Sequence, residues 1–126
     1  MAFETPLYVL SFTAGEDLSS NQFQFVTMES DGQIDLADAE TDIVLGVLQN
    51  KPEAGQAAKV MISGVSKVEA DETLAAGNLV HSSADGQAAV FAAGTDTTKY
   101  SAGLVLEGAA AGELATVLLG NIGRGA

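Results

Sequence analysis

One acidic stretch is the densest group of side chains in this sequence that could bind a metal ion. Carboxylate oxygens are ligands that Ca²⁺ prefers, and the stretch supplies them from Asp31, Asp35, Asp38, Glu40 and Asp42. A calcium loop needs Asp-x-Asp-x-Asp-Gly and a glutamate at its twelfth position, and this spacing does not follow that pattern. The stretch therefore indicates a solvated or partner-facing acidic surface, with a calcium site as the alternative.

The residue types needed for catalysis are sparse. His81 is the single histidine and cysteine is absent, which disfavours both a zinc site and a general base with its partners. Five serines considered as nucleophiles lack the Gly-x-Ser-x-Gly setting; they are Ser11, Ser19, Ser20, Ser82 and Ser83. We therefore predict no catalytic residue, no cofactor and no bound metal, and a protein that is not an enzyme. His81 is expected beside a strand or at the surface.

Gly108 and Gly112 form a Gly-x-x-x-Gly pair, a spacing that can pack transmembrane helices. Glu107 and Glu113 flank the pair and exclude that role, and no Gly-x-x-x-x-Gly-Lys phosphate loop occurs. These residues are expected to be loop glycines between strands.

The charge balance excludes several classes of partner. Seventeen acidic residues against five basic ones give a net charge of −12 in 126 residues, which repels nucleic-acid phosphates and anionic membranes. The hydrophobic fraction of 47% includes no tryptophan and much alanine and valine, so each core side chain buries little area. A thin core without disulfides or a metal usually needs a partner subunit, and we expect a homo-oligomer.

Neither export nor membrane insertion is expected. The N-terminus lacks a basic leader, and its apolar run, Leu7–Leu10, is too short for a signal peptide. The most hydrophobic region, Gly103–Ile122, is interrupted by Glu107 and Glu113 and should not span a membrane. Residues 1–6 could form a flexible arm that orders on a neighbouring subunit, or could simply fray.

Short β-branched or aromatic runs alternate with Gly, Asp and Asn, which predicts short strands and tight turns. Asp31-Gly32 and Asp85-Gly86 each separate two such runs and favour positive φ, so both are predicted hairpin tips. The expected strands are Leu7–Phe12, Phe23–Glu29, Gln33–Leu36, Ile43–Leu48, Ala58–Ser63, Val65–Glu69, Asn78–Ser82, Ala88–Phe91, Gly103–Glu107 and Ala115–Leu119. Helix competes only at Ala54–Lys59 and Gly108–Leu114, where glycines favour loops.

The chain contains an internal repeat. Gly46–Ile62 aligns without gaps on Gly103–Leu119, 57 positions apart (103 − 46). Upstream, Leu18–Phe23 aligns on Leu74–Leu79 at an offset of 56 (74 − 18), and the two Asp-Gly-Gln turns align at 54 (85 − 31). Small differences between the offsets are what changes in loop length produce.

The two halves, about 14–64 and 70–121, are therefore expected to be related β-units. Two copies are too few for a solenoid, so we expect residues 1–126 to form a single domain with one fused core. The predicted fold class is all-β, a small barrel or sandwich, in which Gly103 permits a bulge or a close approach of backbones.

The repeated unit reads Leu-x-x-Gly-Asn-Leu-Val, then Asp-Gly-Gln, then Gly-Leu-Val-Leu-Glu-Gly-Ala-Ala-Ala-Gly-Glu-Leu-Ala-Thr-Val-Leu-Leu. Over about Leu18–Gly120 this pattern resembles the small capsid decoration, or cement, proteins of tailed bacteriophages. The resemblance implies a β-barrel-like fold, attachment to the major capsid protein where capsomers meet, and a homotrimer. The first copy departs from the pattern, with Asn21 in place of the expected glycine and Lys51-Pro52-Glu53 in place of the alanine-rich loop.

The expected function is that of a non-enzymatic decoration protein on the outer capsid surface of the virion, made in the host cytoplasm. It would bridge major-capsid subunits and stabilise the head, with a dimer as the alternative to a trimer. The competing hypothesis is a free β-module that recognises a carbohydrate or a host surface. Its usual aromatic platform is poorly supplied, because the chain has only five Phe and two Tyr.

Overall fold

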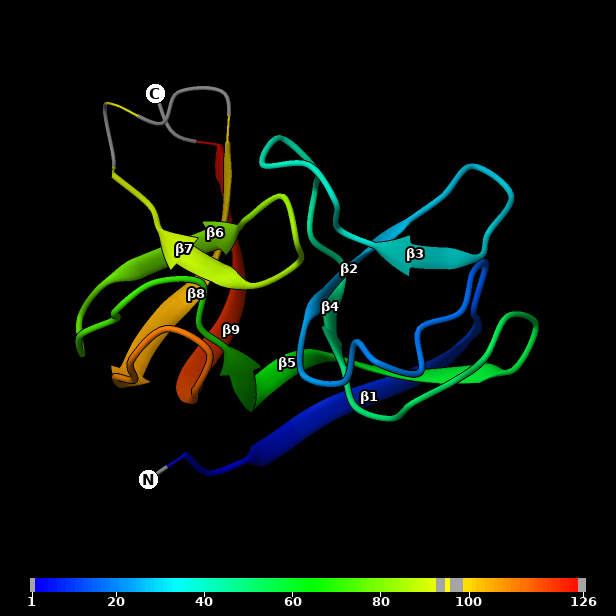
Figure 1. Ribbon diagram of the computed structural model, residues 1–126, viewed down its shortest axis with the longest axis horizontal. Helices are drawn as coiled ribbons and strands as arrows, with labels where there is room; N and C mark the ends of the chain where they lie inside the picture. Colours follow the sequence, from blue (N-terminus) through cyan, green and yellow to red (C-terminus); the bar gives the residue numbers. More distant parts are fainter. Residues whose placement is uncertain (1, 93–94, 96–98, 125–126) are drawn as a thin grey trace.

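The computed structural model describes residues 2–92, 95 and 99–124, and this part of the chain is built of strands without a helix (Figure 1). The strands are β1 (Thr5–Thr13), β2 (Phe25–Met28), β3 (Ile34–Leu36), β4 (Gly46–Leu48), β5 (Ala57–Glu69), β6 (Leu79–Ser82), β7 (Ala88–Val90), β8 (Tyr100–Glu107) and β9 (Leu114–Arg124). The all-β prediction is confirmed.

The strands form one antiparallel sheet in the order β3-β2-β4-β5-β9-β8-β6-β7, and β1 pairs with β5 outside this path. The sheet curls into a half-barrel in which β2–β4 and β6–β9 form two groups, with the long strand β5 passing below both (Figure 1). β5 pairs with β4 and β1 in its first part and with β9 in its last part, so it connects the two halves.

β5 corrects one prediction. The sequence predicts two strands here, Ala58–Ser63 and Val65–Glu69, but the structure has one continuous strand. Gly64 has a φ of +116°, which glycine adopts without the steric cost of a side chain, so the strand bends instead of ending. A Cβ at Gly64 would lie 2.6 Å from the Leu7 nitrogen, so a side chain would also displace β1.

The predicted turns are found in their expected places. Gly32 and Gly86 have φ of +84° and +75° and form the tips of the β2–β3 and β6–β7 hairpins. Gly108 and Gly112 lie in the connection between β8 and β9, as predicted. Other strand limits differ by a few residues, and the largest difference is β9, which continues five residues beyond Leu119 (124 − 119).

The strands of the two halves pair in matching registers. Gly46 of β4 lies opposite Val26, and Gly103 of β8 lies opposite Val80. At both glycines a Cβ would collide with a carbonyl oxygen of the neighbouring strand, β5 in one half and β9 in the other. The glycines therefore allow two backbones to approach closely at the same place in each half.

The structure also corrects the sequence alignment near Asn21. The Phe23 amide donates to the Leu48 carbonyl (2.7 Å), and the Gly77 amide donates to the Val105 carbonyl (2.8 Å). Both donors have positive φ, +64° at Phe23 and +93° at Gly77. The prediction that Asn21 replaces the glycine is therefore wrong, because the first half has a longer turn and Phe23 occupies the position of Gly77.

Each half has a buried core at matching positions. The first consists of Ala14, Leu18, Val26, Ile34, Leu48, Ala58 and Val60. Its counterpart consists of Ala70, Leu74, Val80, Ala88, Val105, Ala115 and Val117. The second cluster also contains Phe25, Ala37, Val47 and Met61 of the first half, so the core of the second half extends onto the first.

The antiparallel pairing of β1 with β5 matches the pairing of the last part of β5 with β9. Thr13 lies opposite Ala57 where β1 ends, and Glu69 lies opposite Leu114 where β5 ends. In each half, the long strand therefore begins against a strand that precedes it in the chain.

Candidate interaction surfaces

The acidic stretch surrounds the β2–β3 hairpin and is a site of mutual repulsion. A hydrogen bond with the Asp35 carboxyl is the main cause of a raised pKa at Glu29. Partial desolvation and the charges of Asp35, Asp42 and Asp31 raise the same pKa further. The raised pKa shows that neighbouring carboxylates disfavour the charged form of Glu29.

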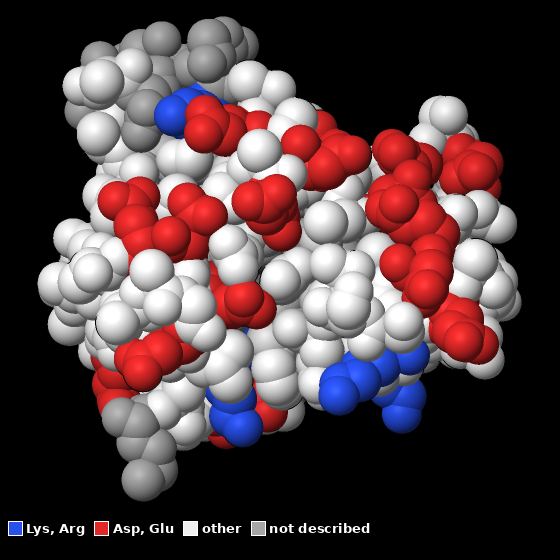
Figure 2. Space-filling model, viewed as in Figure 1, with Lys and Arg blue, Asp and Glu red and all other residues white. Residues whose placement is uncertain are grey.

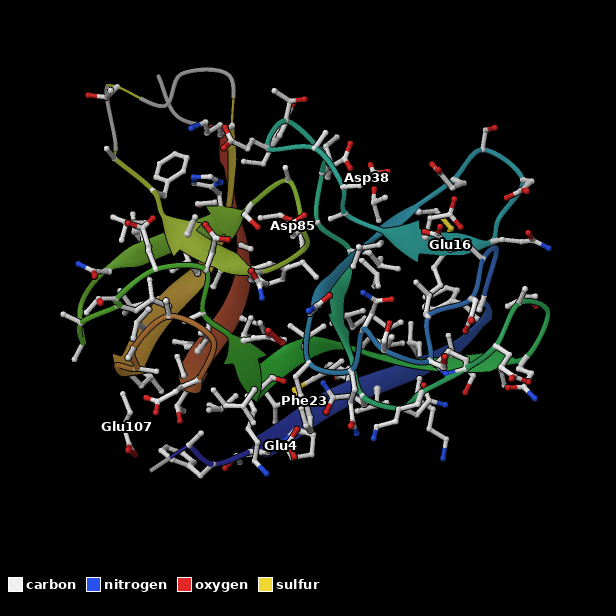
Figure 3. The ribbon with its side chains drawn as sticks, viewed as in Figure 1. Glu4, Glu16, Phe23, Asp38, Asp85 and Glu107 are labelled. Atoms are coloured by element: carbon white, nitrogen blue, oxygen red, sulfur yellow. The ribbon has the colours of Figure 1, made fainter. Side chains whose placement is uncertain are left out.

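The remaining members of the stretch do not complete a metal site. Glu40 forms an ion pair with Lys99, with 3.2 Å between Oε2 and Nζ. Asp38 is exposed on the segment that follows β3 (Figure 3). Within the described residues, no three His, Cys, Asp or Glu side chains are grouped so that they could hold a metal ion.

His81 and the buried serines have structural contacts. His81 lies buried in β6, where its Nδ1 donates to the Ser82 carbonyl (2.7 Å) and its ring meets Phe91 edge to face, 6.3 Å between centroids. Ser82 Oγ donates to the Ala37 carbonyl across the two halves (3.1 Å), and Ser83 Oγ accepts two amides of the β6–β7 turn. The other serines considered are exposed: Ser11, Ser19 and Ser20.

The chain itself caps both ends of the main sheet. The Glu16 carboxylate accepts the Leu36 amide of β3 (2.9 Å), and the Glu72 carboxylate accepts the Val90 amide of β7 (3.1 Å). Figure 3 shows Glu16 beside β3. Each carboxylate binds a backbone amide that an added strand would need for its own hydrogen bonds. Neither β3 nor β7 therefore offers an open edge. Both residues were missed from the sequence, although their spacing of 56 (72 − 16) equals an offset of the repeat.

β1 presents apolar side chains to solvent along nearly its whole length. All its residues except Phe12 are exposed, Leu7 by 70% and Tyr8 by 64%. Thr5–Thr13 contains no charged residue, although the chain carries a net charge of −12. In the described part of the chain β1 pairs with β5 alone, so its outer edge is open. A long, uncharged, apolar edge strand is typical of a surface that joins another chain.

Two apolar rows of the first half end on β1. One row crosses β4 and β5 from Phe25 to Val9, and the other crosses β5 from Leu48 to Leu10. Val9 and Leu10 are 43% and 45% exposed. Because the rows end in exposed apolar side chains and not in polar ones, a partner on β1 would extend both.

Two further apolar surfaces lie on the main sheet. The first, the hairpin hollow, has a volume of about 340 Å³ and is lined by Thr27, Met28, Ile43, Val44 and Leu45. Ile43 is 54% and Met28 is 40% exposed. The second, the second-half row, consists of Leu79, Leu104 and Leu118 in register on β6, β8 and β9, and Leu118 is 44% exposed.

Charge is unevenly distributed over the surface. In Figure 2 acidic side chains are spread over most of the face, while basic ones lie mainly along the lower edge, where Figure 1 places β1, with a further basic patch at the upper left. Lys59 lies opposite Ser11 in the pairing of β5 with β1. β1 is thus bordered by basic side chains in an otherwise acidic protein.

Among the described residues there is no helix of the length and apolarity needed to cross a membrane.

Comparisons with known proteins identify a family for the sequence and a similar fold for the structure. The phage cement protein family matches residues 6–120, and none of the curated proteins matches the sequence. In structure the chain is similar to the head fiber gp8.5 N base of bacteriophage phi29, with a TM-score of 0.68. At 21% identity this similarity, which covers 93% of this chain and 98% of that chain, concerns the fold. Because the family match spans nearly the whole length, the chain belongs to the phage cement protein family.

Proposed function

We propose that this protein is a non-enzymatic phage decoration protein that binds the outer capsid shell at capsomer junctions and stabilises the head. The observation that carries the proposal is β1, an uncharged nine-residue strand with exposed apolar side chains and an open edge, in a chain of the cement family. Glu16 and Glu72 cap the ends of the main sheet, which leaves β1 as an edge able to receive a capsid segment.

The partner in this proposal is the major capsid protein, and the decorating unit is a homotrimer on the virion surface, made in the host cytoplasm. Residues 1–126 form one decoration domain of two related units. Added interface area provides the stabilisation: a standard interface buries roughly 1,600 Å² in total, and symmetric repetition over a shell adds avidity. No metal, cofactor, nucleic acid or membrane takes part.

The test uses capsids of the phage that encodes the chain, stripped of the protein and then decorated again. Decoration should raise the disruption temperature of the capsids, because binding to the intact shell alone shifts the disruption equilibrium. Electron microscopy of decorated and stripped capsids should show added density at capsomer junctions. Failure to bind, unchanged disruption temperature or density elsewhere on the shell would contradict the proposal.

A matched pair of variants tests the role of β1. Leu7→Glu places a charge on the exposed strand and should reduce decoration at least tenfold. Leu106→Glu, at a 37% exposed leucine of β8, is the control and should decorate as the wild type does. Equal binding by the two variants would remove β1 from the capsid contact.

A further inference from the structure

The contact between the two halves is one-sided. The end of the β6–β7 hairpin packs on the first half, where the Gly86 carbonyl accepts the Phe25 amide (2.7 Å) and Ser82 Oγ donates to the Ala37 carbonyl (3.1 Å). Gly86 is buried in this contact. The corresponding end of the β2–β3 hairpin is exposed, and a Cβ built on Gly32 would meet no atom within 4 Å.

The apolar row at this contact is buried in the first half, whereas the matching row of the second half is not. The row Phe25–Val47–Met61 in the first half packs in the cluster that holds the core of the second half, and none of its members is more than 1% exposed. The second-half row occupies the same register positions on β6, β8 and β9. Leu79 and Leu104 are half-buried, and Leu118 is 44% exposed.

The molecule therefore has a second hairpin end that packs on nothing within the chain. It also has a second apolar row that no hairpin end covers. Gly32 matches Gly86 and Met28 matches Ser82, both at an offset of 54 (86 − 32 and 82 − 28). Ser82 is buried in the internal contact, whereas Met28 is exposed and lines the hairpin hollow. A contact between two different surfaces is heterologous, so further copies can continue it and close a ring.

We propose that copies of this chain associate head to tail, repeating between molecules the contact that joins the two halves within one. The β2–β3 hairpin end of one copy, with its hairpin hollow, packs on the second-half row of the next copy. The occupant is a second copy because the chain already carries the counterpart of each open surface. The inference rests on the homo-oligomer of the proposed function and names its interface; closure after three copies gives the trimer.

The first test is the solution mass measured by light scattering at matched concentrations. The wild type should have a multiple of the chain mass of 12.8 kDa. Met28→Glu and Leu118→Glu place a charge on opposite sides of the contact, and each variant alone should fall to a single chain. Leu7→Glu, on β1 and outside both surfaces, is the matched control and should keep the wild-type mass.

Mixing equal amounts of the two variants is the decisive measurement. The Met28→Glu chain keeps an intact second-half row, and the Leu118→Glu chain keeps an intact hairpin end, so the mixture should form particles of two chains. A symmetric contact through one surface would instead leave one variant with the wild-type mass. Far-UV circular dichroism checks folding, and Met28→Ser and Leu118→Ser, with a partial loss of mass expected, replace any glutamate variant that unfolds.

The outcomes separate this inference from the proposed function. A wild type of single-chain mass at every concentration would remove the homo-oligomer and this interface together, while leaving capsid binding to its own test. An oligomeric wild type whose mass neither variant changes, or a folded mixture that stays monomeric, would overturn the interface alone. Variants that keep the wild-type mass but lose capsid binding would assign these surfaces to the capsid protein and also overturn the inference.

Discussion

Gly103→Ala should destabilise the protein, because the added methyl group has no room between β8 and β9. The methyl carbon would lie 2.5 Å from the Leu118 carbonyl oxygen and 2.7 Å from Val117 Cγ1. β9 is held on its other side by β5, so relief requires β8 to move away by about 1 Å, to an ordinary non-bonded separation of about 3.5 Å. Overpacking of this kind costs about 1–3 kcal/mol, and contact with backbone favours about 2 kcal/mol.

The expected loss of about 2 kcal/mol corresponds to a fall in Tm of about 6–10 °C for a chain of this length. Gly120→Ala in β9 is the control, since its methyl would meet no atom within 4 Å, and it should stay within about 0.5 kcal/mol of the wild type. Thermal and urea unfolding are compared at one protein concentration, because association also shifts Tm. Equal stability of the two variants would refute the close approach of β8 and β9.

The pKa of Glu29 in the folded protein is raised above its ordinary value of 4.5. Protonated Glu29 therefore stabilises the fold below pH 4.5, and this stabilisation is lost as the pH rises through the pKa of the folded protein. Glu29→Gln should remove this part of the pH dependence of the urea midpoint between pH 4 and 7, and an unchanged profile would contradict the Asp35 contact. Glu16→Ala and Glu72→Ala should each lower the free energy of unfolding by about 1 kcal/mol, whereas exposed Glu53→Ala should not; a match to this control would refute capping. Calcium should leave Tm unchanged within about 1 °C relative to chelator, and a larger rise would reveal a metal site.

Strand positions and hairpin tips followed from the sequence because their signals are local. An Asp-Gly pair favours the positive φ found at Gly32 and Gly86 whatever surrounds it. Gly64 was misread as a break because glycine can end a strand or bend it, and the neighbouring strands decide between the two. Here β1 and β9 both pair with β5 at Gly64, which holds the strand together through the bend.

The interaction surfaces were harder to predict because a sequence does not record what covers a side chain. Leu7–Leu10 has the composition of a core strand, yet its side chains are exposed. Phe25 and Leu79 occupy matching positions, but a hairpin end covers only the first of them. The alignment at position 23 failed because Leu18–Phe23 matches Leu74–Leu79 without a gap in sequence, whereas only the hydrogen bonds of the folded chain show that the first turn is longer.

The last part of β5 lies between the two halves in the sequence, and it pairs with β9 of the second half. Cutting the chain at Ala70, where the second copy of the repeat begins, would therefore remove the strand against which β9 forms. A single unit cannot complete its own sheet and must take a strand from elsewhere, as the first unit takes β1.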